Sequence, residues 1–82
     1  MAMVSVRFFA GARDATGRGD DSFEAVTLGE VLDAARERYG EPFRAVLATS
    51  RVWVNGDEAA QRERTVLADA DEIAILPPVS GG

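Results

Sequence analysis

The chain has 82 residues, of which 46% are hydrophobic and 28% are charged, and its 9 basic and 14 acidic residues give a net charge of −5. This length allows one small domain, which has little surface to spare for a catalytic cleft of its own. The acidic balance has the wrong sign for a protein that binds the phosphates of a nucleic acid, so no nucleic-acid partner is expected.

Several residue types that carry enzyme chemistry are missing. The chain has no cysteine and no histidine, which excludes disulfides, a thiol nucleophile, cysteine-based zinc sites and a histidine base. All nine basic residues are arginine, so no lysine amine can attack an activated carboxyl group. Asp69, Asp71 and Glu72 lack the glycine and the distal glutamate of a calcium loop, and we expect a solvated turn and no metal site.

The N-terminal segment predicts neither a secretory signal nor a membrane span. It has no basic region at its start, and Arg7 interrupts its only apolar run. We therefore expect a cytoplasmic protein without a membrane partner.

The first third of the chain predicts two strands. Residues 3–9 alternate with the period of a strand and so place two sets of side chains on opposite faces: Val4, Val6 and Phe8 on one, Ser5, Arg7 and Phe9 on the other. The glycine-containing stretch 11–21 predicts a loop, and 22–26 alternates more weakly as a second strand. Two strands joined by one loop favour a hairpin.

A helix is predicted over 28–39. Thr27 and Glu30 have the spacing of a capping box, in which the Thr27 hydroxyl accepts from the Glu30 amide and the Glu30 carboxylate accepts from the Thr27 amide. Apolar residues then recur at helical spacing: Leu28, Val31, Leu32, Ala35 and Tyr39. Gly40, followed by Glu41 and Pro42, is expected to stop the helix.

The second half of the chain predicts further strands. The segment 43–50 fits either a short helical turn or a packed loop. Residues 51–54 predict a strand that ends at Asn55-Gly56, the strongest short hairpin signal, and 65–67 predict another short strand. After a turn at 68–72, residues 73–76 predict the last strand.

These elements indicate an α+β domain over 1–76, in which one main helix packs on one face of a mixed sheet of four to five strands. If Val52, Val54, Ile73 and Ile75 face the helix, the other face receives Phe9, Trp53, Ala74 and Leu76. Large apolar groups on an open face favour a docking surface. The alternative is that the segment 43–50 or the Arg51 stem covers Trp53 or Phe9.

The last six residues predict a flexible tail over 77–82. Pro77 and Pro78 end the sheet because neither can donate to a strand ladder, and they stiffen an arm that reaches about 20 Å when extended. Val79 and Ser80 can contact the channel of a partner, and Gly81 and Gly82 are thin enough to enter it. The terminal carboxylate, with a pKa near 3.5, is a poor electrophile until it is activated, for example as an acyl adenylate.

Two stretches resemble one known family. Phe8-Phe9-Ala10, followed by Arg13 and Gly17, resembles the run after the first strand of the MoaD/ThiS-type β-grasp sulfur carriers. The residues from Leu67 to the Pro-Pro-Val-Ser-Gly-Gly ending resemble the closing strand and tail of the same family, closest to the small subunits of molybdopterin synthase (MoaD). The family's usual Asp-Gly-Asp turn is Asp69-Ala70-Asp71 here, so we expect no positive φ at Ala70.

The resemblance implies a ubiquitin-like β-grasp fold and the cycle of a sulfur carrier. An E1-like adenylyltransferase (MoeB/ThiF type) would adenylate Gly82 with ATP and Mg²⁺, and a sulfur donor such as a rhodanese or a cysteine desulfurase would turn it into a thiocarboxylate. The acceptor would be the large subunit of molybdopterin synthase (MoaE type). The chain itself would bind no cofactor and supply no catalysis, and its partners would contact Phe9, Arg13, Trp53 and Leu76.

Two alternatives remain open. The first is a carrier of the same build for another acceptor, in cysteine, thiamine or thiosugar synthesis. The second is a ubiquitin-like modifier that forms amide bonds through its Gly-Gly end.

Overall fold

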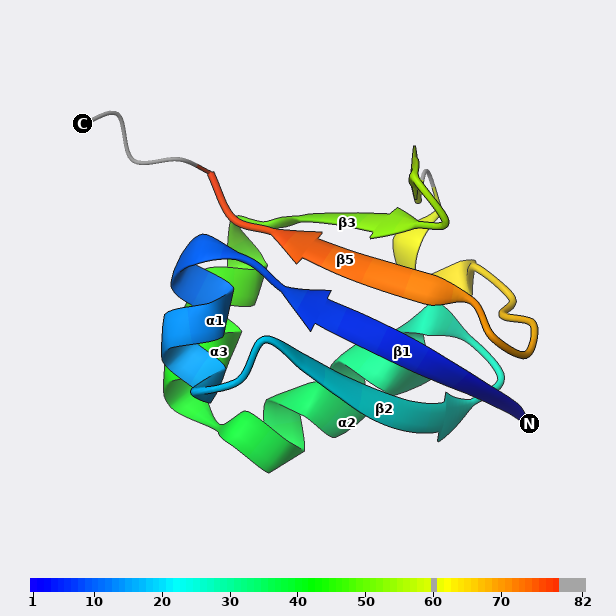
Figure 1. Cartoon of the computed structure of the whole chain (residues 1–82), viewed down its shortest axis with the longest axis horizontal. Helices are drawn as coiled ribbons and strands as arrows, with labels where there is room; N and C mark the ends of the chain where they lie inside the picture. The colour runs from blue at the N-terminus through cyan, green and yellow to red at the C-terminus, as the bar shows by residue number, and fades with distance from the viewer. Residues whose placement is uncertain (60, 79–82) are drawn as a thin grey trace.

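The computed structural model describes residues 1–59 and 61–78, and these contain a five-stranded mixed sheet (Figure 1). The strands are β1 (Ala2–Phe8), β2 (Asp20–Ala25), β3 (Arg51–Val54), β4 (Asp57–Glu58) and β5 (Glu72–Leu76). Their order across the sheet is β2-β1-β5-β3-β4. β1 and β5 are parallel, and the other pairs are antiparallel. The predicted pairing of the first two strands is confirmed.

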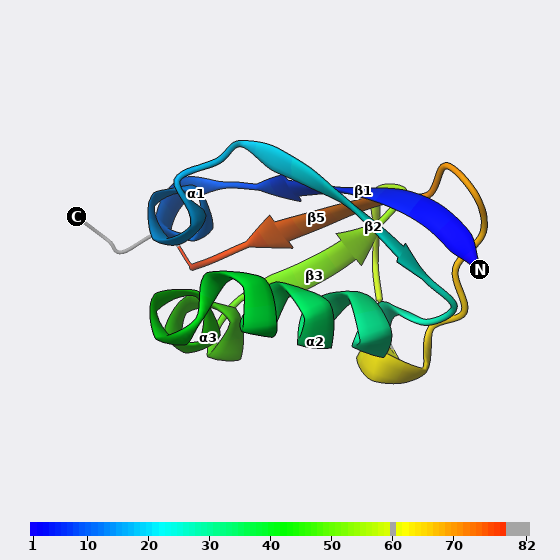
Figure 2. The same ribbon diagram turned by 90° about the horizontal axis from the view of Figure 1, so that it is seen from below.

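Three α-helices accompany the sheet in the described residues: α1 (Ala10–Thr16), α2 (Leu28–Tyr39) and α3 (Glu41–Ala48). A 3₁₀ turn, η1 (Arg62–Arg64), follows β4. α2 and α3 lie along one face of the sheet, and α1 lies at the end where β5 leads into the tail (Figure 2). α2 is the predicted main helix with the predicted bounds, and it ends at Gly40, where φ is 75°.

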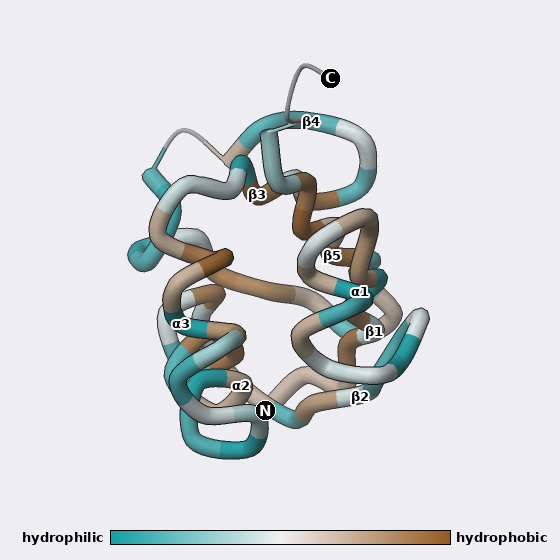
Figure 3. Tube along the Cα trace, turned by 90° about the vertical axis from the view of Figure 1, so that its left-hand side faces the viewer, coloured by the Kyte–Doolittle hydropathy of each residue, from teal (hydrophilic) through white to brown (hydrophobic). Residues whose placement is uncertain are grey.

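The core lies between the sheet and α2 with α3. Of the inward residues predicted on β1, β3 and β5, Val54 is half-buried and the others are buried: Val4, Val6, Phe8, Val52, Ile73 and Ile75. Phe43 of α3 is fully buried and meets Phe8 edge to face at 5.7 Å between ring centroids. In Figure 3, hydrophobic colour follows β3 and β5, which border this core, and hydrophilic colour marks β4 at the edge of the sheet.

The predicted loop over 11–21 is wrong, because its first part is the helix α1. Alanine and arginine favour helix, and the burial of Ala12 packs this short helix against the core directly after Phe9. Gly17 ends it in the left-handed region at φ 72°, so this glycine is a helix stop and not a sign of an irregular loop. β1 and β2 are therefore joined by a helix and a short turn.

The open question over 43–50 is settled in favour of a helix that begins earlier than either alternative. Pro42 lies in the first turn of α3. Backbone amides in the first turn of a helix have no acceptor within that helix, so the missing N–H of proline costs no hydrogen bond there. Gly40 therefore ends α2, and Glu41 and Pro42 begin α3 directly after it.

The Asn55-Gly56 turn is confirmed, with φ of 51° and 88° at its two central residues. The strand that it joins to β3 is β4, which pairs Trp53 with Glu58. The predicted strand over 65–67 is wrong, because only one isolated bridge, between Thr27 and Val66, forms there.

Two local predictions are corrected. Ala70 has φ 70°, so the turn keeps the left-handed residue that a glycine would occupy more easily. The Glu30 amide donates to the Thr27 hydroxyl at 3.3 Å as predicted, but the Glu30 carboxylate accepts from the Val26 amide at 2.8 Å, one residue before the predicted donor.

Candidate functional site

The end of β5 fixes where the tail begins. The main chain of Leu76 is still in the sheet, opposite Arg51 of β3. Pro77 is half-buried and Pro78 is exposed, so the chain leaves the surface at this point. The remaining predicted site residues, Val79 to Gly82, lie outside the described residues.

Three of the predicted partner-contact residues lie together at this end of the open sheet face. The Phe9 amide donates to the Ile75 carbonyl at 3.3 Å, which places Phe9 beside Leu76. Trp53 pairs with Ala74, one step along the same face. Phe9 and Leu76 are 41% and 37% exposed, and Trp53 is half-buried. We call Phe9, Trp53 and Leu76 the tail-end face.

The fourth predicted contact, Arg13, lies on α1, one helical turn after Phe9. Its amide is 3.4 Å from the Phe9 carbonyl, and its exposed side chain runs beside Gly19, in the turn that leads into β2. The structure thus separates Arg13 from the tail-end face, and its role as a contact stays a prediction.

Of the two alternatives for what covers the apolar residues, the segment 43–50 does not match the geometry, whereas Arg51 lies on the same face of β3 as Trp53. The large side chains of α3, Phe43 and Leu47, point into the core on the opposite face of the sheet from Trp53. The Arg51 guanidinium pairs with Glu58 of β4 at 3.2 Å, and Glu58 lies opposite Trp53, so the Arg51 side chain runs beside the half-buried Trp53. Phe9 and Leu76 therefore keep their exposed surface.

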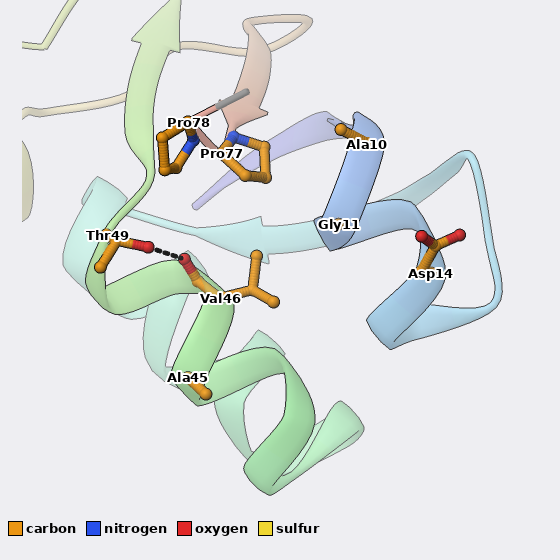
Figure 4. Close-up of a pocket in the computed structure, with 8 residues that line it drawn as sticks. All are labelled: Ala10, Gly11, Asp14, Ala45, Val46, Thr49, Pro77 and Pro78. Carbon is orange, nitrogen blue, oxygen red and sulfur yellow. Dashed lines mark hydrogen bonds between the residues drawn. The ribbon is translucent and has the colours of Figure 1, made fainter. Parts of the chain in front are cut away.

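Sequence reasoning missed a groove on the other side of the tail. The groove has a volume of about 540 Å³ and lies between α1, α3 and the first two tail residues (Figure 4). Its helical walls are made mainly of small residues: Ala10, Gly11, Asp14, Ala45, Val46 and Thr49. We call it the α1–α3 groove. The sequence does not predict this groove, because 11–21 predicts a loop and 43–50 fits either a helical turn or a packed loop, although Gly17, a typical helix stop, is a usable sign of α1.

The opposite end of the sheet holds a polar network instead. The Asn55 side chain donates to the Asp71 carboxylate at 2.8 Å and accepts from the Glu72 amide at 2.9 Å. The Ala68 amide also donates to Asp71, at 2.8 Å, and this bond, followed by the one from Asn55, lowers the pKa of the Asp71 carboxyl. We call this end, with Asn55 and Asp71 at its centre, the far end.

A second carboxylate joins β2 to α2. Asp21, whose side chain is only 9% exposed, accepts hydrogen bonds from the Tyr39 hydroxyl and, at 2.8 Å, from the Arg38 guanidinium. Burial alone would raise the pKa of Asp21, but these bonds and one from the Ser22 amide outweigh it and lower the pKa. Burial and the Asp21 carboxylate raise the pKa of Tyr39. The cluster fastens two elements and leaves no free base.

The described residues contain no cluster of acidic side chains that could hold a metal ion, and no helix among them is long and apolar enough to cross a membrane. The apolar surfaces around the base of the tail form the candidate functional site. Such a site offers apolar surface on which another protein can dock.

Comparison with known proteins places the chain in a family. The family model described as the ThiS family matches residues 6–82. The chain belongs to the ThiS family. This confirms the resemblance to the MoaD/ThiS-type carriers.

Several relatives of this ThiS-family chain share one name. The "Molybdopterin synthase sulfur carrier subunit" of Phaeosphaeria nodorum is 35% identical over 86 residues, which cover 95% of this chain and 88% of that relative. The protein of the same name from Aedes aegypti is 32% identical over 88 residues, which cover 96% of this chain and 88% of that relative.

Solved structures confirm the ubiquitin-like β-grasp fold. Small archaeal modifier protein 1 from Methanosarcina acetivorans superposes with a TM-score of 0.87 at 30% identity, over 100% of this chain and 98% of that chain. A chain in the complex of subunits 1 and 2 of molybdopterin-converting factor from Helicobacter pylori superposes with a TM-score of 0.75, also at 30% identity, over 98% of this chain and 99% of that chain.

Proposed function

We propose that this ThiS-family chain is a sulfur carrier whose Gly82 carboxyl is adenylated and then converted to a thiocarboxylate, and that it donates this sulfur as the small subunit of molybdopterin synthase. The family match and the shared name of the relatives support the carrier role and the pathway. The observation that carries the proposal is the position of the tail. It leaves the sheet after Leu76 through two prolines, between two apolar surfaces.

The proposed chemistry takes place on the main chain of Gly82. A carboxylate oxygen attacks the α-phosphate of ATP and releases pyrophosphate, which turns the poor electrophile into an acyl adenylate. The outer sulfur of a persulfide then displaces AMP and forms an acyl disulfide. A thiol of the sulfur donor or the enzyme cleaves this disulfide and leaves the thiocarboxylate on the chain. The absence of cysteine and lysine from the sequence keeps the carrier's own side chains from intercepting the activated carboxyl.

ATP, Mg²⁺ and the catalytic side chains belong to the partners in this proposal. The activating enzyme is an E1-like adenylyltransferase, the sulfur comes from a rhodanese or a cysteine desulfurase, and the acceptor is the large subunit of molybdopterin synthase. The named complex of two subunits from Helicobacter pylori supports the last pairing. We expect all these steps in the cytoplasm.

The tail-end face is the proposed first contact with these partners. Phe9 and Leu76 offer exposed apolar surface beside the start of the tail, and aromatic and apolar residues at the centre of an interface contribute most of its affinity. Arg13, on α1, would contact a partner only at the edge of this surface.

One observation favours a second function. The likeness to a small archaeal modifier protein, at 30% identity over the whole chain, supports a ubiquitin-like modifier whose activated Gly82 forms amide bonds with amines of other proteins. Both functions need adenylation of Gly82, and they differ in the nucleophile that follows.

The experiment that tests the proposal combines the chain with an E1-like adenylyltransferase, MgATP and a persulfide donor. Intact mass spectrometry should show one oxygen replaced by sulfur. A chain that lacks Gly82 should remain folded, because β5 ends six residues earlier, and should gain no sulfur. Adducts on other proteins without a sulfur-bearing carrier would support the modifier instead, and sulfur gained by the truncated chain would contradict the mechanism.

A further inference from the structure

We propose that the α1–α3 groove is the second half of the surface that docks the activating enzyme, and that it receives an apolar side chain that protrudes from the enzyme's rim beside a basic group. The inference rests on the proposed function and adds to the tail-end face a contact on the other side of the tail. Figure 4 shows the arrangement, with α1 and α3 facing each other and Pro77 and Pro78 beside the opening between them.

The groove is shaped by residues that cannot easily close it. A Cβ atom added at Gly11 would lie 3.9 Å from both methyl carbons of Val46, an ordinary van der Waals distance, so a methyl group at this position would fill the space that glycine leaves between the helices. Ala12 of α1 and Leu47 of α3 are buried beneath and hold the two helices in place. On the α3 side of the groove, the Thr49 hydroxyl donates to the Val46 carbonyl at 3.3 Å, so its hydrogen bond is already made within the chain. The groove thus offers a preformed and mainly apolar recess.

The length of the tail requires a partner to cover this region. Four residues follow Pro78, and four extended residues span at most about 14 Å. The atoms that react with the Gly82 carboxyl must therefore lie within that distance of Pro78. A folded enzyme is larger than this reach, so its surface comes close to what surrounds Pro78, which includes the α1–α3 groove.

The charge at the groove indicates the chemistry of the partner. Asp14 is the acidic residue of the lining, its side chain is exposed, and none of the salt bridges among residues 1–59 and 61–78 involves it. An exposed carboxylate at the rim of an apolar recess is matched by a basic group on the partner. A second copy of this acidic chain fits less well, because it would add negative charge to negative charge.

The test fills the groove and compares this with a matched change outside it. Ala45 and Ala48 are both exposed on α3, but only Ala45 lines the groove. With the E1-like adenylyltransferase and MgATP, Ala45→Gln should raise the KM for the chain at least about tenfold and leave kcat within about twofold. Ala48→Gln should change neither value by more than about twofold. Asp14→Arg, which reverses the charge at the rim of the groove, should raise KM about fivefold.

The outcomes distinguish a failure of the groove inference from a failure of the proposed function. Circular dichroism must show that Ala45→Gln is folded, and Asp14→Arg provides an independent reading if it is not. If the wild-type chain is adenylated while Ala45→Gln and Asp14→Arg behave like Ala48→Gln, the groove inference is overturned and the proposed function stands. If the wild-type chain is not adenylated, both fall. A wild-type dimer in analytical ultracentrifugation that Ala45→Gln dissociates would assign the groove to a second copy and overturn the inference as well.

Discussion

The two ends of the sheet are built in opposite ways. At the far end, side chains close the turns, with Asn55 bonded to Asp71 and to the Glu72 amide, and Asp69 accepting from the Met3 amide at 2.9 Å. At the tail end, β5 runs into two prolines between the tail-end face and the α1–α3 groove, and the apolar side chains there keep exposed surface. The far end satisfies its own polar groups, whereas the tail end leaves surface for another protein.

This difference separates stability from function along one short sheet. Substitutions at the far end should change the free energy of unfolding and spare the recognition of partners, because no part of the proposed docking surface lies there. Substitutions at the tail end should do the reverse, since its exposed residues contribute little to the core.

The largest expected effect comes from a charge on the tail-end face. Leu76→Asp should raise the KM for adenylation on the order of 100-fold, because a buried carboxylate would replace apolar contact at the centre of the interface. Val66→Asp is the matched control, since Val66 is also apolar and is 73% exposed, away from the tail. Steady-state kinetics of pyrophosphate release measures both variants. Equal KM values for the two would remove the distinction between the ends.

The next effect concerns Asn55. Asn55→Ala should lower the free energy of unfolding by about 2 kcal/mol, because it removes two hydrogen bonds and places alanine at positive φ. Asn55→Gly should lose less stability than Asn55→Ala, because glycine adopts positive φ without strain. Adenylation kinetics should not change in either variant. Urea denaturation measures the loss, and a far end that tolerates alanine without loss would show that the network is not a fastening.

A smaller effect is expected where α2 begins. A Cβ at Gly29 would lie 2.9 Å from the Glu63 carbonyl oxygen of η1, which is main chain and cannot move without displacing the turn. Gly29→Ala should therefore cost about 1 kcal/mol of stability, even though alanine favours helix by a similar amount. Glu63→Ala should not rescue it, because the carbonyl remains. Thermal unfolding of the single and double variants checks this, and a stabilised Gly29→Ala chain would refute the close contact.

The smallest effect is the response to acid. The pKa of Asp71 is lower in the folded chain than its ordinary value, so its contribution to stability is present above about pH 4 and is lost as the pH falls through the folded pKa. Asp71→Asn should make the free energy of unfolding depend less on pH in this range. It should also lower the free energy of unfolding at neutral pH, because asparagine lacks the charge that the hydrogen bonds to Asp71 favour. Urea midpoints between about pH 5 and pH 3 measure it. Identical slopes in the two chains would show that Asp71 is not responsible.

The sequence predicted the parts of the fold that carry a strong periodic pattern. The capped helix over 28–39, the alternating strand after Met3 and the Asn55-Gly56 turn follow from local chemistry alone, and the structure has all three. The segment 65–67 has strand-forming residues, but only Val66 bridges to another element, and the sheet receives β4 instead. Which segment becomes the edge strand therefore depends on pairing between distant segments and not on local strand preference.

The candidate site was predictable only on one side. Alternation along the strands indicated that Trp53 and Leu76 face outward, because the period of two fixes the side of the sheet. The α1–α3 groove depends on the approach of two short helices that lie far apart in the chain, and no local pattern encodes that approach. Ala70 illustrates the same limit, since its φ of 70° is imposed by the closing of the turn against Met3, whose carbonyl accepts from the Ala70 amide at 2.9 Å.

The central claim is that the reactive group of this chain is the main-chain carboxyl of Gly82. Cleavage after arginine releases the last 18 residues as one peptide, because no arginine follows Arg64. After incubation with the adenylyltransferase, MgATP and the persulfide donor, fragmentation of this peptide should place one sulfur on Gly82 and none elsewhere. A loaded chain whose sulfur lies on any other residue would contradict the account.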